Sequence, residues 1–187
     1  MKDFLMLIIF PSKTFDKLND KKSRSITLYL MVTFAIAGSM LPKYIAASIN
    51  NPKGLEALTI QLMALPFVYF LLVYAIGYCY WIVSIGFKGL SSFTEMRTLI
   101  ACSMLPFVLQ FIINVPFVAV GLIKNDVSII THYNYLTSLI LWILSFRITM
   151  VGIAKFNKFN WMITLITYLI STSILGGFAY LFLQIKR

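Results

Sequence analysis

The sequence predicts an all-α fold: a polytopic membrane bundle of five transmembrane helices with a short interfacial N-terminal segment. Two observations favour this class. Of the 187 residues, 60% are hydrophobic and 12% are charged, whereas a soluble domain is about 45–50% apolar and about 25% charged. Apolar runs of about 18 or more residues also recur, and each is long enough to cross a bilayer core of about 30 Å. No polar stretch is long enough to form a separate soluble domain.

Residues 1–25 are predicted to be a cytoplasmic interfacial amphipathic segment, and residues 26–187 to be the five-helix transmembrane domain. The first apolar run ends at Phe10 without a small-residue cleavage site, so it is not typical of a cleaved signal peptide. Pro11 should break this run, and Ser12 is the expected N-cap of a second short helix. A frayed tail is the alternative for the first few residues.

In that second helix, Phe15 and Leu18 would share an apolar face, while the lysines would point toward lipid headgroups. The five spans are then predicted at 26–49, 59–87, 98–123, 133–153 and 159–185. Pro66 should kink the second span, and the third should be bent because it contains Pro106 and Pro116. The polar connections are predicted at 50–54, 87–97, 124–128 and 155–158.

The basic residues predict the orientation of the bundle. Eleven of the sixteen fall on the side of the N-terminus, so the positive-inside rule favours a cytoplasmic N-terminus in a multi-pass plasma-membrane protein. These eleven are Lys2, Lys13, Lys17, Lys21, Lys22, Arg24, Lys88, Arg97, Arg147, Lys155 and Lys158. The net charge of +10 is therefore expected to meet lipid headgroups rather than nucleic acid. Cys79 and Cys102 lie in apolar runs, which predicts buried thiols without a disulfide, a metal or another cofactor.

Four charged residues are candidates for contact with a partner or with lipid. Lys88, Glu95 and Arg97 lie in the polar loop between the second and third spans, where they would cap the bundle. Arg147 lies inside the fourth apolar run, and a charge in a span is a functional hypothesis by default. Its long side chain can reach the interface, or it can pair with Glu95 or with a backbone carbonyl.

Uncharged polar and small residues in the spans suggest either packing or a path. Gln110 and Asn114 are four residues apart and share a helical face, so they would hydrogen-bond a neighbouring helix or line a polar path. Ser173, Gly176 and Gly177 predict a close helix contact within the chain or across a dimer. The single histidine, His132, is expected to belong to the aromatic belt at the interface.

Several short patterns make the chain resemble the YIP family, the Ypt/Rab-interacting membrane proteins and their bacterial relatives. They are Pro11–Phe15 before the first span, Lys88–Phe93 followed by Glu95, Ala101–Ser103 with Leu105 and Pro106, and Trp142. The resemblance implies a five-helix bundle with a cytoplasmic N-terminus. The glycine pair common in the family's loop is here reduced to Gly89. Eukaryotic members carry a long polar N-terminal arm tied to GTPase contact, which residues 1–25 do not match, so the chain resembles the short bacterial members.

The sequence holds no Ser/His/Asp set, HExxH, P-loop or CxxC pattern, and we expect no enzymatic activity. The leading hypothesis is a non-enzymatic membrane scaffold or accessory protein of YIP type, which assists an ABC-type exporter or protects against membrane-active peptides. Its expected partners are the lipid bilayer and either another membrane protein or a second copy. The alternative is a small transporter or channel subunit with a polar path near Gln110 and Asn114.

Overall fold

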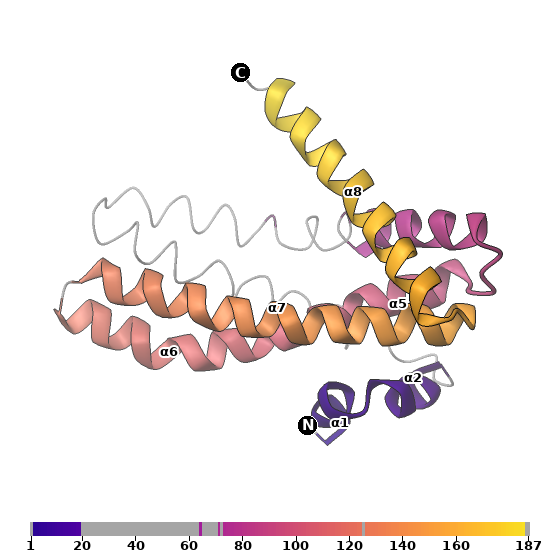
Figure 1. Cartoon of the computed structure of the whole chain (residues 1–187). Helices are drawn as coiled ribbons and strands as arrows, with labels where there is room; N and C mark the ends of the chain where they lie inside the picture. Colours follow the sequence, from indigo (N-terminus) through magenta and orange to yellow (C-terminus); the bar gives the residue numbers. More distant parts are fainter. Residues whose placement is uncertain (1, 20–63, 65–70, 72, 125, 186–187) are drawn as a thin grey trace. The chain divides into compact units, whose positions relative to one another are not determined.

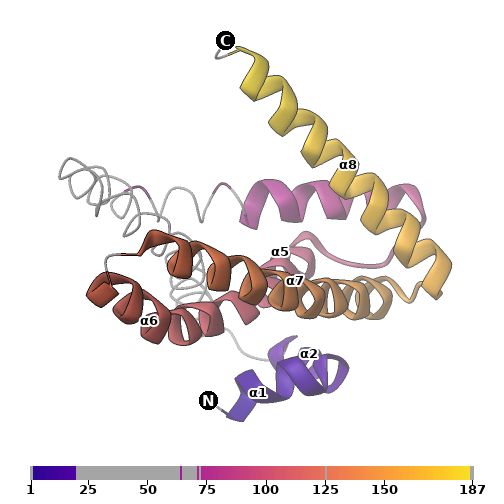
Figure 2. The same cartoon turned by 60° about the vertical axis from the view of Figure 1, so that its left-hand side comes forward.

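The computed structural model describes residues 2–19, 64, 71, 73–124 and 126–185 (Figures 1 and 2). Within these residues every regular element is a helix and there is no strand. The predicted all-α class is therefore confirmed for the part of the chain that is described. The first predicted span, 26–49, lies outside the described residues, as does most of the second span before residue 73.

Two described helical stretches are long and apolar enough to cross a membrane by length and composition, His132–Asn157 and Trp161–Phe178. Two shorter apolar stretches are Val73–Gly86 and Ile112–Gly121. The membrane character of the helices agrees with the sequence, while the number of five spans stays a prediction.

The chain divides into two compact units. The first contains Met1–Lys21, Leu71–Cys102 and Arg147–Arg187, and the second contains Lys22–Phe70 and Ser103–Phe146. The N-terminal helices thus belong to the same unit as the last part of the chain. The predicted boundary near residue 25 falls outside the described residues.

The N-terminal segment forms two short helices, α1 (Lys2–Ile9) and α2 (Pro11–Asn19). The predicted break before Pro11 is confirmed, but the prediction of Ser12 as the N-cap is wrong. Helix α2 begins at Pro11 itself, because a proline has no N–H to leave unpaired and its φ angle suits the first helical position. Ser12 is therefore a helical residue.

The apolar face of α2 packs against protein. Phe15 is 1% exposed, and its ring meets that of Phe156 edge to face at a centroid distance of 5.2 Å. Leu7 of α1 is buried as well. Phe15 therefore docks α2 onto the helix that contains Phe156. The amphipathic pattern alone had suggested that this side chain faces lipid, and it does not.

The predicted third span is two helices, α5 (Phe93–Met104) and α6 (Pro106–Lys124). The expected bend at Pro106 is a complete break, and Pro106 takes the first position of α6 for the reason given for Pro11. Pro116 remains inside α6. Because α5 already begins at Phe93, Glu95 and Arg97 are helical and the predicted loop 87–97 is shorter than expected.

Helix α5 is held between two glycines of its own unit. A Cβ atom on Gly77 would lie 3.1 Å from the Cα of Arg97, and one on Gly152 would lie 3.1 Å from Leu99 Cγ. The absence of both side chains lets three helices approach closely. Leu99 and Ile153 are fully buried there.

The last two helices are α7 (Val127–Asn157) and α8 (Trp161–Ile185). Both begin with a capping side chain: Asp126 Oδ1 accepts the Ser128 N–H at 2.9 Å, and Asn160 Oδ1 accepts the Ile163 N–H at 2.9 Å. The loop predicted at 124–128 is shorter than expected, because α7 already begins at Val127. The loop predicted at 155–158 is also too long, because α7 continues to Asn157 and includes Lys155.

We expect Phe15→Ala to loosen the N-terminal helices from the rest of their unit. Truncating a fully buried phenylalanine costs about 3–5 kcal/mol. Limited proteolysis of the protein in detergent should therefore cut the first 20 residues faster. Phe10→Ala is the matched control, because Phe10 is 57% exposed. Equal protection of the wild type and Phe15→Ala would contradict the docking.

Candidate functional site

The helix Val73–Gly86 ends in a backbone arrangement that requires a left-handed residue. The Gly89 N–H donates to the Ser84 carbonyl at 2.8 Å and the Lys88 N–H donates to the Ile85 carbonyl at 2.8 Å. These two bonds form a Schellman motif, which satisfies carbonyls at the end of the helix. Its left-handed position is occupied by Lys88, with φ at 61°. A residue with a side chain pays about 1–2 kcal/mol for this conformation.

Helix α7 ends in the same way. The Phe159 N–H donates to the Ala154 carbonyl at 3.0 Å, and the Lys158 N–H donates to the Lys155 carbonyl at 3.4 Å. Lys158 holds the left-handed position with φ at 55°. Two helices of the same unit thus end with a lysine where glycine is the usual residue.

The side chain of Asn157 joins these two helix ends. Its Oδ1 accepts the Ser91 N–H at 3.2 Å, and its Nδ2 donates to the Ile153 carbonyl at 3.1 Å and to Ser84 Oγ at 3.4 Å. The approach is so close that a Cβ on Gly89 would clash with Asn157 Oδ1 and lie 2.8 Å from the Ser84 carbonyl oxygen. Glycine is therefore required at position 89 by lack of space, although its φ is ordinary.

Glu95 is a helix cap in this structure. Glu95 Oε2 accepts the Ser92 N–H at 2.7 Å, and the Glu95 N–H donates to Ser92 Oγ at 3.2 Å. This reciprocal pair is a capping box, which begins α5 at Phe93. The S-x-x-E spacing is visible in the sequence and could have predicted this role.

Arg97 lies against aromatic rings. Its Nη1 donates to the hydroxyl of Tyr74, and its guanidinium lies 4.8 Å from the centroid of the Tyr74 ring. The Phe93 ring contacts those of Tyr74, Tyr78 and Trp81 at centroid distances of 5.9–6.0 Å. Arg97 therefore contributes a cation–π contact to an aromatic cluster, and Trp81 Nε1 also donates to the Ser91 carbonyl at 3.2 Å.

Arg147 and Lys155 hold the N-terminal helices. Arg147 donates from Nη1 to the Ile8 carbonyl at 3.3 Å and from Nη2 to the Ile9 carbonyl at 3.2 Å. Lys155 Nζ donates to the Ser12 carbonyl. The two cations are eight residues apart, two turns of one helix face. Because Pro11 interrupts the helix after Ile9, Arg147 supplies donors to carbonyls at the end of α1.

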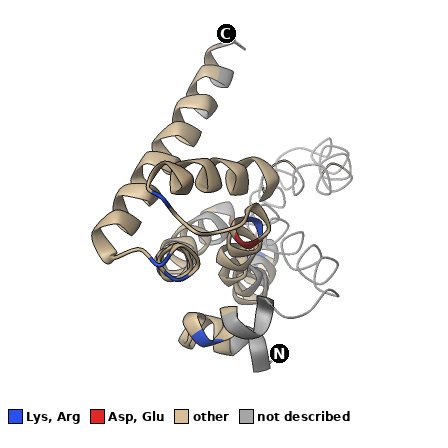
Figure 3. Cartoon of the chain, turned by 90° about the vertical axis from the view of Figure 1, so that its right-hand side faces the viewer, with Lys and Arg blue, Asp and Glu red and all other residues tan. Residues whose placement is uncertain are grey.

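Three segments therefore meet at the last turns of α7, and we call this region the α7 junction. It consists of Arg147, Lys155 and Asn157 with residues 8–15 and 84–91, which they contact. In Figures 1 and 2, α1 and α2 lie beside this part of α7, and Figure 3 shows described lysines and arginines in blue. The segments that meet here are three of those that the charge pattern had assigned to one side of the membrane.

The second unit contains a buried amide cluster between α6 and α7. Gln110 Nε2 donates to Asn134 Oδ1 at 2.7 Å and to Ser138 Oγ at 2.5 Å, while Asn114 Nδ2 donates to Asn134 Oδ1 at 2.8 Å. Thr137 Oγ1 donates to Asn114 Oδ1 at 3.1 Å. The predicted pair Gln110 and Asn114 therefore share a partner, Asn134, which the sequence reasoning missed. The signal that could have found it is an amide side chain at the start of the fourth apolar run.

The remaining sequence candidates belong neither to the α7 junction nor to the amide cluster, and of the two thiols predicted to be buried, Cys102 is buried and Cys79 is only partly so. Ser173, Gly176 and Gly177 lie on an exposed part of α8, and a Cβ on either glycine meets nothing within 4 Å. A close helix contact at this face stays a prediction. His132 is exposed beside the Tyr133 ring. Cys79 and Cys102 are free thiols, and the described residues contain no group of three potential metal ligands.

Fold and site together define a helical membrane protein whose polar side chains fasten helices to one another. The family model for the Yip1 domain matches residues 5–183, nearly the whole chain. The chain therefore belongs to the Yip1 domain family and is a membrane protein of the YIP kind, which confirms the resemblance seen in the sequence. No curated protein and no solved structure matches it.

We expect Gly89→Ala to destabilise the protein and Gly86→Ala to leave it unchanged. A methyl group at position 89 would meet Asn157 and Ser84, and overpacking of this kind costs about 1–3 kcal/mol. A Cβ on Gly86 meets nothing within 4 Å. Thermal unfolding in detergent measures the difference, and equal midpoints for the two variants would contradict the contact with Asn157.

We expect Asn134→Leu to lower the stability of the protein. The change removes the oxygen shared by Gln110 and Asn114 and with it two interhelical hydrogen bonds, which at about 0.6 kcal/mol each amount to a loss of about 1 kcal/mol. Denaturant unfolding in mixed micelles measures the loss. His132→Leu is the control, since that side chain is exposed. A loss for Asn134→Leu no greater than for the control would contradict the shared role.

Proposed function

We propose that this protein is a non-enzymatic scaffold or accessory subunit in the plasma membrane, with its N-terminus in the cytoplasm. The observation that carries the proposal is the α7 junction, where hydrogen bonds from Arg147, Lys155 and Asn157 fasten three segments to one another. Such a region is suited to present a fixed surface to another membrane protein. The polar residues singled out from the sequence serve the same end, since Glu95 caps a helix and Arg147 binds carbonyls.

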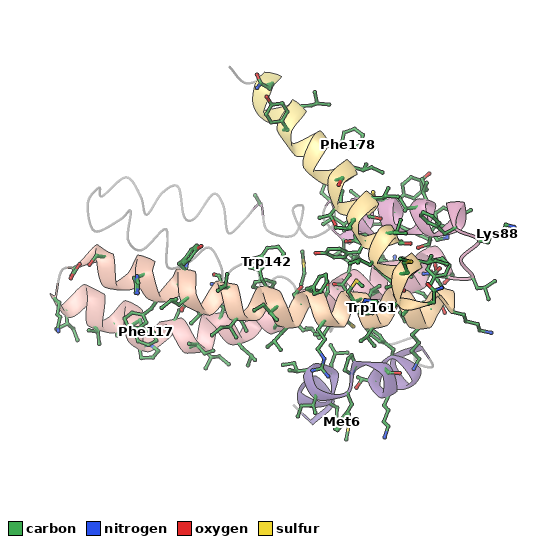
Figure 4. The ribbon with its side chains drawn as sticks, in the orientation of Figure 1. Met6, Lys88, Phe117, Trp142, Trp161 and Phe178 are labelled. Atoms are coloured by element: carbon green, nitrogen blue, oxygen red, sulfur yellow. The ribbon has the colours of Figure 1, made fainter. Side chains whose placement is uncertain are left out.

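The partner in this proposal is a membrane protein, and α8 is the surface that would meet it. Phe178, which is labelled in Figure 4, Tyr180 and Leu181 of α8 are all about 60% exposed, and a Cβ on Gly176 or Gly177 would meet nothing within 4 Å. Small residues allow two helix backbones to approach closely in lipid. An ABC-type exporter of peptides is the partner we favour, and protection against membrane-active peptides is the role.

Transport by the chain itself is the second candidate, and the contacts favour it less. The Gln110 and Asn114 side chains that would line a path donate to Asn134 and Ser138. A substrate using this route would have to replace bonds that already join α6 to α7. We therefore assign these residues to helix packing.

Purification in mild detergent followed by mass spectrometry tests the scaffold proposal. We expect a membrane protein to co-purify with the wild type. It should not co-purify with the double variant Ser173→Leu, Gly177→Leu, because the larger side chains prevent a close helix contact. Ile174→Phe adds bulk one position away from the small residues and should retain the partner.

The same strains give a second measurement, because loss of the gene should raise sensitivity to membrane-active peptides. The doubly substituted protein should restore resistance less well than the Ile174→Phe protein. Recovery of the wild type without a partner, together with unchanged peptide sensitivity on deletion, would overturn the proposal.

A further inference from the structure

Lys88 and Lys158 occupy positions where lysine lowers stability. Each holds the left-handed residue of a Schellman motif, with φ at 61° and 55°. Glycine adopts this conformation without the steric penalty of a Cβ. A lysine occupies this unfavourable position at two helix ends, and Asn157 joins these ends. We infer that the two lysine side chains have a function other than stabilising the fold.

The two ammonium groups point into open surroundings. Both lysines are exposed, and Figure 4 shows the Lys88 side chain extending away from the helices. Within the described residues neither Nζ makes a hydrogen bond or an ion pair. Glu95 and Asp126 act as helix caps, with Glu95 on Ser92 and Asp126 on Ser128. The lysines are therefore available to an anion from outside the chain.

The neighbours of the two lysines are those of a membrane–water interface. Leu90 is 67% exposed, Trp161 is 63% exposed and Met162 is 72% exposed. Two apolar helices end at the lysines and α8 begins at Trp161. Tryptophan and lysine beside the ends of apolar helices mark the level of the lipid headgroups. An acidic soluble protein would find exposed apolar side chains here, whereas a lipid offers both an anion and acyl chains.

We propose that Lys88 and Lys158 together bind the headgroup phosphate of an anionic phospholipid, whose acyl chains lie against Leu90, Trp161 and Met162. A basic residue near an anionic membrane contributes about fivefold in affinity, so the pair gives a clear preference for anionic over zwitterionic lipid. The contact does not depend on the scaffold role and would exist without any protein partner.

The test uses the purified full chain in neutral detergent, with thermal unfolding as the readout. Phosphatidylglycerol should raise the unfolding midpoint of the wild type more than phosphatidylcholine does, since binding to the folded state stabilises it. In Lys88→Gly with Lys158→Gly, the midpoint without lipid should rise by about 4–16 °C, because strain is relieved at two positions. The additional shift with phosphatidylglycerol should be lost.

Three controls separate the causes. Lys88→Arg with Lys158→Arg keeps both charges and should keep the phosphatidylglycerol shift. Lys124→Gln removes an exposed charge from the last residue of α6, in the second unit. This variant should also keep the phosphatidylglycerol shift. Glycerol phosphate, which carries the anion without acyl chains, should give no shift.

An unchanged phosphatidylglycerol shift in the double glycine variant would overturn the proposal. An equal shift with glycerol phosphate would overturn the assignment to lipid and leave an ion site. A lower lipid-free midpoint for the glycine variant would overturn the argument from strain.

Discussion

A buried amide at the end of α7 is the constraint on which the first unit depends. Asn157 is 2% exposed and bonds the backbone of Ser91, the hydroxyl of Ser84 and the carbonyl of Ile153. Burying a backbone N–H without a partner costs about 1–3 kcal/mol, and Asn157 supplies the partner of the Ser91 N–H. The course of the 84–91 turn that allows this bond brings residue 89 too close to Asn157 for any side chain. In the same turn, residue 88 is left-handed.

The N-terminal helices obey the same rule by other means. Pro11 has no N–H, and helix α1 ends just before it with carbonyls left over. Arg147 donates from α7 to two of them, those of Ile8 and Ile9, and its positive charge lies at the negative end of the α1 dipole. Lys155 donates to the Ser12 carbonyl in the first turn of α2. The charged side chain of Arg147 thus hydrogen-bonds backbone carbonyls here. Both of these bonds go to carbonyl oxygens and neither goes to a carboxylate.

The sequence predicts the elements of this protein better than their ends. Prolines located the break at Pro11 and a bend at Pro106, because a proline acts locally through the chain itself, but the bend at Pro106 is a break between two helices. Helix ends were less predictable where side chains cap them, as at Asp126 and Asn160, since apolar periodicity does not register a capping bond. The partners of Arg147 and Gln110 were unpredictable in detail. Ile8 lies 139 residues from Arg147, and such pairing depends on tertiary packing rather than on spacing.

That separation has a consequence for how the protein is made. A ribosome adds about 5–20 residues per second, so roughly 7–30 s pass between the synthesis of Ile8 and that of Arg147. During this interval the apolar face of α2, which Phe15 later buries against Phe156, has no helix to cover it. The nascent chain must keep this face on the membrane surface or on a chaperone until α7 is in place. Helix α2 is thus synthesised well before the residue that buries its apolar face.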